Sequence, residues 1–188
     1  MSPYTESIER WYAIRVRSNC EKVVSLTLSG KGYATFLPSY RKLSRWSDRN
    51  KQIELPLFPG YVFSSFDINR RLPVLMTPGI LSIIGVGSTP EPVQEEELSA
   101  IRRFIASGSP VEPWPFVKVG DAVVVDCGPM AGLEGILAQV KNRYRLVVSL
   151  TLLQRSIAVE IDRDCIRPVA TSGKRLLVQA PKAMAANG

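Results

Sequence analysis

Between residues 41 and 51 the chain gathers five basic residues and one tryptophan around a single acidic residue. The set consists of Arg41, Lys42, Arg45, Trp46, Arg49 and Lys51. Guanidinium and ammonium groups pair with phosphates, and an indole ring stacks on an unpaired base. The pattern therefore indicates nucleic-acid binding, although a solvated hairpin tip has the same composition. Four further basic residues would extend this basic face: Arg17, Lys31, Arg70 and Arg71.

The sequence offers little for catalysis or metal binding. It contains no histidine, which is the commonest general base and metal ligand. The three cysteines, Cys20, Cys127 and Cys165, are odd in number and widely spaced, which fits neither a disulfide framework nor paired metal ligands. No nucleophile with a nearby base and no glycine-rich phosphate loop stands out. We expect no enzyme, no cofactor, no metal and three unpaired thiols.

Composition describes an ordinary globular chain. Hydrophobic residues make up 45% and charged residues 22% of the 188 residues. No apolar run approaches the about 20 residues that a membrane-spanning helix needs. The net charge of +7 favours contact with a polyanion without establishing it. Since the amino-terminal residues also lack the pattern of a secretion signal, we expect a monomer in the cytoplasm that makes no membrane contact.

A proline-rich stretch divides the chain. Pro110, Pro113 and Pro115 lack an amide donor and restrict their predecessors to extended conformations, which is typical of a linker. The predicted parts are a first domain over 1–109, a linker over 110–116, a second domain over 117–169 and a disordered tail over 170–188.

The first domain mixes strand and helix patterns. Tyr12, Ile14 and Val16 alternate with polar or small residues, as in a strand with one buried face. Apolar residues recur at helical spacing over 21–29 and again over 94–106, where three glutamates come first and two arginines come late, as the helix dipole favours. We predict an α+β domain with an antiparallel sheet flanked by helices.

The second domain shows only strand patterns. The expected strands cover 122–126, 135–141, 145–153 and 156–162. About 50 residues of short strands at regular separations indicate a small all-β barrel. The turn Leu153–Ser156 and the bases Arg143 and Arg145 are either partner contacts on this barrel or ordinary surface.

A glycine-rich turn joins the first two of these strands. It contains Gly128, Pro129, Gly132 and Gly135, and glycine permits positive φ angles and close backbone approach. Alone, this is a turn in a β-barrel. It also resembles the KOW motif, which has a hydrophobic strand, a Gly-Pro pair and two spaced glycines before the next strand. Met130 stands where many members of that family have phenylalanine.

The first domain carries a second resemblance. Trp11-Tyr12 opens the first strand, residues 57–63 read Leu-Phe-Pro-Gly-Tyr-Val-Phe, and residues 77–80 read Thr-Pro-Gly-Ile. In this order, and followed by a KOW-like module, they make residues 9–169 similar to the NusG family of transcription factors. The resemblance implies a non-enzymatic protein with a NusG-type N-terminal domain and a small, SH3-like KOW barrel.

The resemblance also implies partners. In the NusG family an apolar patch docks on the clamp region of the largest RNA polymerase subunits, which makes Tyr12, Phe58, Pro59 and Tyr61 the docking candidates here. Each of the four is equally a candidate core residue. The basic segment would meet the non-template DNA strand of the transcription bubble. The KOW barrel would recruit a ribosomal protein or a termination factor.

Two questions stay open at the level of sequence. The basic hairpin and the Leu-Leu-Gln-Arg-Ser stretch at 152–156 look more like an operon-specialised NusG paralogue than the general factor. A free RNA-binding or ribosome-associated KOW protein is the alternative function, but it gives no role to the aromatic segment. In one branch of the family the second domain refolds as a helical hairpin, which the β-branched residues of 157–161 disfavour here.

Overall fold

The computed structural model describes residues 9–46, 49–116, 120–140 and 143–169. We call the elements before residue 109 the first unit: β1 (Arg10–Val16), α1 (Glu21–Gly30), β2 (Ala34–Phe36), β3 (Ser39–Trp46), β4 (Arg49–Pro56), β5 (Tyr61–Phe66), η1 (Ile68–Arg70), α2 (Leu72–Leu75), β6 (Ile80–Ile83), β7 (Gly85–Val86), β8 (Thr89–Pro90) and α3 (Glu95–Ala106). The elements that follow form the barrel: β9 (Val111–Trp114), β10 (Asp121–Val125), η2 (Gly128–Met130), β11 (Glu134–Val140), β12 (Arg143–Leu150), β13 (Arg155–Ile161), η3 (Arg163–Cys165) and β14 (Ile166–Pro168).

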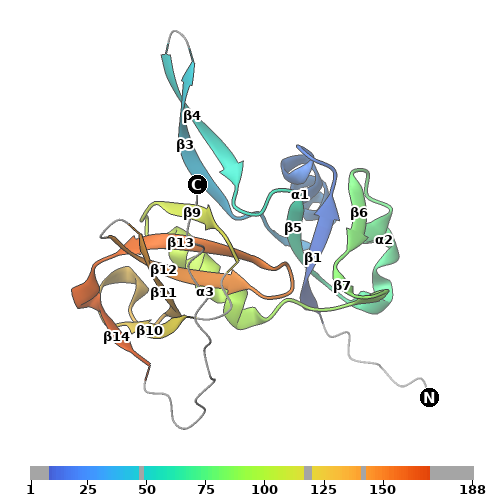
Figure 1. Ribbon diagram of the computed structural model, residues 1–188. Coiled ribbons are helices and arrows are strands. Elements are labelled where there is room, and N and C mark those ends of the chain that lie inside the picture. The colour runs from blue at the N-terminus through green and yellow to red at the C-terminus, as the bar shows by residue number, and fades with distance from the viewer. Residues whose placement is uncertain (1–8, 47–48, 117–119, 141–142, 170–188) are drawn as a thin grey trace, which may run out of the picture.

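Two antiparallel sheets organise these units (Figure 1). The first unit has a four-stranded sheet in the order β2-β5-β1-β6, and the barrel has a six-stranded sheet in the order β14-β10-β11-β12-β13-β9. The expected α+β domain followed by an all-β module is confirmed.

One face of the first sheet packs against α1 and α2. Tyr12, Ile14 and Val16 are buried there, which confirms the alternation expected for β1. Val24 and Leu28 of α1 are buried in the same cluster. This layer is a closed core of the first unit.

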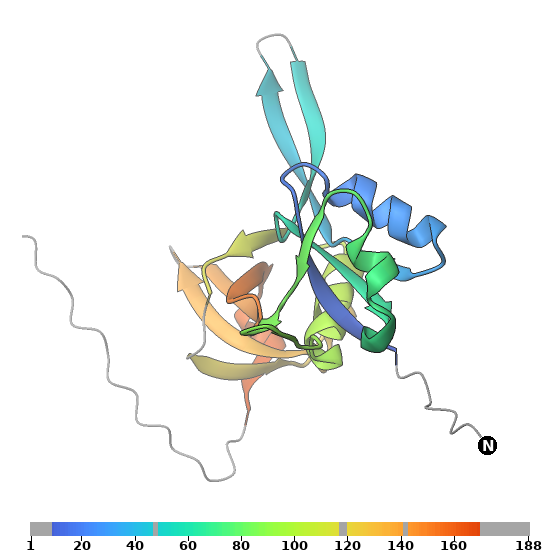
Figure 2. The ribbon, with the colours of Figure 1, turned by 90° about the vertical axis from the view of Figure 1, so that its right-hand side faces the viewer.

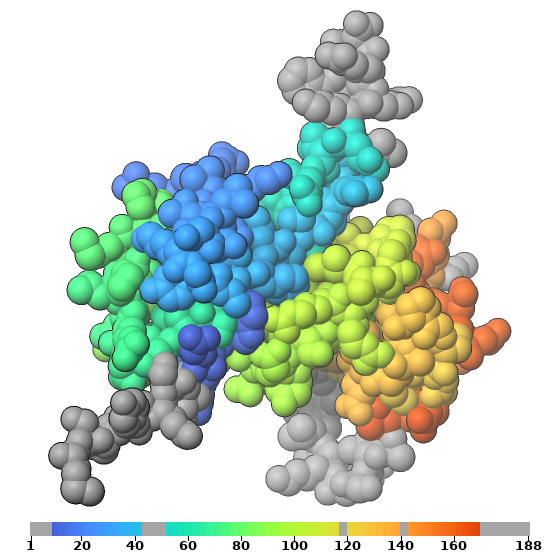
Figure 3. Space-filling model, turned by 180° about the vertical axis from the view of Figure 1, so that it is seen from behind, coloured from blue at the N-terminus to red at the C-terminus, as the bar shows by residue number. Residues whose placement is uncertain are grey.

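The opposite face of the first sheet packs against α3, and the apolar core continues from there into the barrel. Leu98, Ile101 and Phe104 are fully buried, whereas Ile105 is only half-buried. A surface helix buries one apolar stripe. Helix α3 buries a wider face, because the first sheet covers one side of it and the barrel covers another. Figure 3 shows the yellow-green segment around α3 running between the first unit and the barrel.

The basic segment forms a long hairpin that extends away from both units (Figure 1, Figure 2). Strands β3 and β4 pair from Ser39 opposite Pro56 to Trp46 opposite Arg49. The bases therefore lie along the two strands and not only at the tip. The tip residues 47–48 and the side chains of 43–51 fall outside the described part of the chain.

The proline-rich stretch differs from the linker predicted over 110–116. Val111–Trp114 forms β9, which pairs with β13 from Val111 opposite Val159 to Trp114 opposite Ser156. Proline is tolerated on an edge strand, where its missing amide leaves no ladder bond unmade, and it already favours extended backbone. Only residues 107–110 separate α3 from this strand, so a free linker over 110–116 is corrected to an edge strand with its flanks. We keep a domain division after residue 109 as a proposal.

Two cysteines that we expected to be unpaired form a disulfide. Cys127 and Cys165 are bonded, with their Cα atoms 5.2 Å apart and a sequence separation of 38. The pairing of Val125 with Ile166 between β10 and β14 brings them together. The expectation was wrong because linear spacing does not reveal which strands are neighbours. Cys20 is a free thiol.

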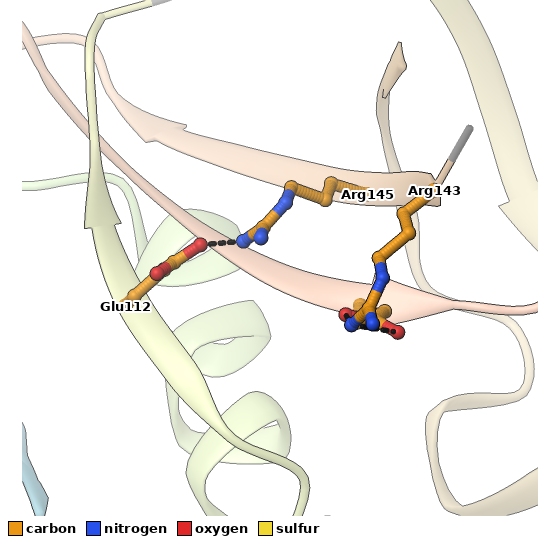
Figure 4. A network of polar contacts seen from close by, with 4 residues as sticks. Glu112, Arg143 and Arg145 are labelled. Carbon is orange, nitrogen blue, oxygen red and sulfur yellow. Dashed lines mark hydrogen bonds and ion pairs between the residues drawn. The ribbon is translucent and has the colours of Figure 1, made fainter. Parts of the chain in front are cut away.

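Strand β9 is held to the rest of the barrel by a side-chain network (Figure 4). Arg145 of β12 makes an ion pair with Glu112 of β9, and its guanidinium lies 4.9 Å from the centre of the Trp114 ring. The Arg145 side chain is only 20% exposed. Arg143 on the same strand pairs with Glu160 at 2.9 Å, but its side chain is 67% exposed.

These two arginines predict a contrast in stability. Arg145→Ala removes the stacking on Trp114 and leaves Glu112 unpaired, so we expect the free energy of unfolding to fall by about 2 kcal/mol. Arg143→Ala removes an exposed ion pair and should change the free energy by less than about 0.5 kcal/mol. Urea denaturation of both variants measures the difference. Equal effects would show that β9 is not anchored by Arg145.

Candidate docking and nucleic-acid surfaces

The four aromatic-segment candidates do not share one surface. Tyr12 is 4% exposed and lies beneath α1 and α2, with its ring 4.9 Å from that of Phe66. Burial raises the pKa of the Tyr12 phenol, with the nearby Asp67 adding to the effect and Arg10 opposing it. Tyr12 is therefore a core residue on the face of the sheet opposite to Tyr61. The strand alternation that predicted the burial of Tyr12 also places it on the opposite face from Tyr61.

Phe58 and Pro59 lie in the turn between β4 and β5, and Tyr61 is the first residue of β5. Phe58 is 1% exposed and packs edge-on against Phe63 with ring centres 5.8 Å apart. Pro59 is exposed and Tyr61 is half-buried. Phe58 thus supports the turn from within, and the other two form its outer surface.

The first helix fixes this turn. Gly60 adopts a φ of 85°, a left-handed conformation that suits glycine, and its amide donates to Oε1 of Glu21 at 2.8 Å. The Glu21 residue is buried, at 8% exposure. A buried carboxylate that accepts a backbone amide holds the turn in place, which keeps Pro59 and Tyr61 at the margin of the sheet.

The barrel faces this margin directly. A cavity of about 300 Å³ lies between the units and is lined by Leu57 and Tyr61, by residues 113–116 and by residues 153–156. The Arg155 guanidinium lies 5.7 Å from the centre of the Tyr61 ring. The turn Leu153–Ser156, which the sequence marked as a partner contact or ordinary surface, contacts the first unit of its own chain.

Helix α3 makes two further polar contacts between the units in the described part of the chain. The amide of Thr151 donates to Oε1 of Glu97 at 3.2 Å, and the guanidinium of Arg103 donates to the carbonyl of Ala131. These contacts were not foreseen from the sequence. A glutamate in the first turn and an arginine in the last turn already have a sufficient explanation in the helix dipole, so no signal marked them as contacts between units.

The basic residues fall at two ends of the first sheet. Arg17 follows Val16, whose amide donates to Gly60 at 2.9 Å beside the base of the hairpin that carries Arg41 and Lys42. Arg70 and Arg71 follow the other end of β5, and the six residues of that strand span about 20 Å. Arg17, Arg41, Lys42, Arg70 and Arg71 are exposed. The face predicted as continuous is therefore divided, and only Arg17 lies near the hairpin.

Lys31, which follows α1, has structural partners in the first unit. Its Nζ donates to Oγ1 of Thr77 at 2.7 Å and to the carbonyl of Pro73 at 3.1 Å. These bonds tie the end of α1 to α2. Because its Nζ is engaged in these bonds, Lys31 is a poorer candidate for phosphate binding than exposed Arg17, Arg41 and Lys42. Arg45, Trp46, Arg49 and Lys51 have side chains outside the described part, so their contact with nucleic acid stays a prediction.

The glycine-rich turn has the geometry that the sequence suggested. Gly128 and Gly132 adopt φ angles of 74° and 79°. A Cβ on Gly135 would lie 2.8 Å from the carbonyl oxygen of Val147, so this position requires glycine for close strand approach. Pro129 lies within η2, and Met130 is buried at 7% exposure. The turn thus directs Met130 into the core.

Two kinds of feature are absent from the described residues. Within them, no group of three or more histidine, cysteine, aspartate or glutamate residues is placed to hold a metal ion. No helix in the same residues is long and apolar enough to cross a membrane.

The fold defines a two-unit protein in which an α+β unit carries a β-barrel. Residues 9–102 match the family model described as transcription termination factor nusG. This match covers half of the chain, and the chain belongs to the NusG family. The family consists of non-enzymatic transcription factors, so the expectation that this chain is not an enzyme is confirmed.

Individual relatives agree with this assignment. The transcription termination/antitermination protein NusG of Pseudomonas aeruginosa is 27% identical over 175 residues, covering 86% of this chain and 99% of the relative. The protein of the same description from Thermus thermophilus is 28% identical over 177 residues, covering 83% and 96%. Among solved structures, one titled "Domain interaction in Thermotoga maritima NusG" aligns with a TM-score of 0.51 at 20% identity, covering 86% of this chain and 98% of that one. The last similarity supports the fold.

Because Phe58 and Tyr61 differ in burial, their alanine variants should lose different amounts of unfolding free energy. Phe58→Ala empties a fully buried site, so we expect the free energy of unfolding to fall by about 3 kcal/mol or more. Tyr61→Ala removes a half-buried ring and should cost about 1 kcal/mol. Guanidinium denaturation followed by tryptophan fluorescence compares the two. If Phe58→Ala is the milder variant, Phe58 is not the support of the turn.

Proposed function

We propose that this chain binds RNA polymerase at its clamp region through the first unit and favours processive elongation. Membership of the NusG family supplies the class of activity. The observation that carries the proposal is the turn at 58–61, where buried Phe58 supports exposed Pro59 and half-buried Tyr61. A rigid aromatic ring on a fixed turn is the kind of anchor that dominates protein interfaces. We leave Tyr12 out of the proposed contact because it is buried on the other face.

In this conformation the barrel covers part of the proposed surface. Arg155 stacks on Tyr61, and Leu57 faces the same cavity. A polymerase subunit that uses Tyr61 must therefore compete with the barrel for it. If the competent state is a fraction of the population, the apparent affinity is reduced by that fraction.

Once displaced, the barrel is tethered to the polymerase by the chain itself. We propose that it then recruits a ribosomal protein or a termination factor, with an effective concentration raised by the tether. The chain would act as a monomer in the cytoplasm and serve particular operons as a specialised paralogue. The specialised role rests on the basic hairpin and on the Leu-Leu-Gln-Arg-Ser stretch.

The hairpin is the proposed contact for the non-template DNA strand. It extends from the body and carries the bases along both strands (Figure 2). The barrel is less suited to nucleic acid, because each of its arginines in the described ranges already contacts a carboxylate or an aromatic ring. These are Arg143, Arg145, Arg155, Arg163 and Arg167. This arrangement gives no support to the alternative of a free RNA-binding KOW protein.

Two single substitutions test the docking surface in the full chain. Tyr61→Ala removes the proposed anchor, so we expect its affinity for core polymerase to fall by about 2 kcal/mol, or about 30-fold. Arg155→Ala removes only the contact that the barrel makes with Tyr61. It should leave the affinity unchanged or increase it. Titration of labelled chain with core polymerase measures both.

The two variants show whether polymerase contacts Tyr61 or the barrel turn. Unchanged affinity of Tyr61→Ala rejects the contact at Tyr61. Reduced affinity of Arg155→Ala instead assigns the polymerase contact to the barrel turn and not to the first unit.

The hairpin is tested by salt dependence. Replacing Arg45, Arg49 and Lys51 with alanine should weaken binding to a single-stranded DNA or bubble scaffold and reduce the slope of log K against log salt by about 2, as expected for three lost phosphate contacts. The matched control is Arg70→Ala with Arg71→Ala, since these bases lie at the other end of the sheet. A hairpin variant with the salt slope of the unchanged chain removes the hairpin from the DNA site.

A further inference from the structure

We propose that the Cys127–Cys165 disulfide is a reversible redox switch that controls docking of the barrel on the first unit. Both cysteines belong to the barrel: Cys127 directly precedes η2, and Cys165 is the last residue of η3. The effect of the bond on docking follows from the loop that it anchors.

The disulfide anchors the loop that contacts α3. Cys127 directly precedes η2, which carries Met130 into the core shared by both units. The next residue, Ala131, accepts the hydrogen bond from Arg103 of α3. One covalent bond therefore fixes the start of the segment that supplies both an apolar and a polar docking contact.

On the other side the disulfide holds the last strand. Cys165 ends η3, and β14 follows with only three residues, paired to β10 from Val123 opposite Pro168 to Val125 opposite Ile166. The amide of Asp126 donates to the carbonyl of Cys165 at 2.8 Å. A three-residue edge strand is a segment of low local stability. Without the covalent bond, β14 and the loop beside it gain freedom together.

The bond is open to exchange with small thiols. Cys127 is exposed and Cys165 is half-buried, so a reagent approaches the Cys127 side. Exposed disulfides are the ones that are labile or regulatory. Inside cells thiols are kept reduced, and disulfides there are usually transient or redox-sensing. The placement of the protein inside the cell rests on the proposed function, whereas the docking contacts between the units do not.

The chemistry is thiol–disulfide exchange with a small-molecule disulfide such as oxidised glutathione. One cysteine thiolate attacks the reagent and releases one glutathione thiolate. The second thiolate attacks the resulting mixed disulfide and releases the other. The protein loses two protons and two electrons, and the reagent takes them up as two molecules of glutathione.

The experiment uses the full chain with Cys20→Ser, so that only the pair can react. Oxidised and reduced samples are prepared with glutathione disulfide and glutathione, and alkylation with mass spectrometry counts the free thiols. Nuclear magnetic relaxation then gives the tumbling time of each unit. We expect one common time for the oxidised chain, and a barrel time that falls to about half on reduction, because the barrel then moves separately. We also expect the reduced form to melt about 10 °C lower.

The redox-inert control carries Cys127→Ser and Cys165→Ser in the same background and should match the reduced chain under both conditions. Three results would overturn the switch: no disulfide forms with glutathione disulfide, both redox states tumble alike, or reduction abolishes amide protection in β12 and β13. Loss of amide protection in β12 and β13 would mean that the bond is needed for the barrel to fold and does not control docking. Because no polymerase is present, any of these failures is distinguishable from a failure of polymerase binding.

Discussion

The arrangement of the whole chain depends on the burial of α3 from two sides. Leu98, Ile101 and Phe104 are all 0% exposed, and burial of each such side chain contributes about 2 kcal/mol. They belong to one apolar cluster that includes residues of the first sheet and of the barrel. Separation of the units would expose part of this cluster to water. The docked arrangement is therefore the one that the hydrophobic effect favours in the absence of a partner.

Under the proposed function, this burial competes with polymerase binding. The turn at 58–61 is rigid because Phe58 is buried and Gly60 is held by Glu21. The same turn is partly covered because the barrel packs beside it. A partner that binds Tyr61 must supply enough interaction energy to replace the barrel, so binding is expected to be selective for a large, complementary surface.

Two local features of the barrel determine how firmly it is held. Strand β9 adds an edge strand to the barrel sheet. Only residues 107–110 are then left to connect α3 with the barrel. Arg145 anchors that strand through Glu112 and Trp114. The Cys127–Cys165 bond anchors the opposite edge of the sheet. Both edges of the barrel sheet are thereby fixed by side chains and not by the backbone ladder alone.

The sequence by itself determined what depends on neighbours along the chain. The alternation in β1, the amphipathic pattern of α3 and the glycines at 128 and 132 predicted their local structures, because strand, helix and turn preferences act over a few residues. The absence of histidine removed the commonest general base and metal ligand. The order and spacing of the motifs made the chain resemble the NusG family.

Only the tertiary structure decided which distant residues meet. It placed Tyr12 and Tyr61 on opposite faces, paired Cys127 with Cys165, turned a proline-rich stretch into β9 and divided the basic residues between two ends of the sheet. The physical reason is that these outcomes depend on strand order and on the shared core around α3. Strand order and core packing arise from cooperative burial across the chain, and no short stretch of sequence encodes them.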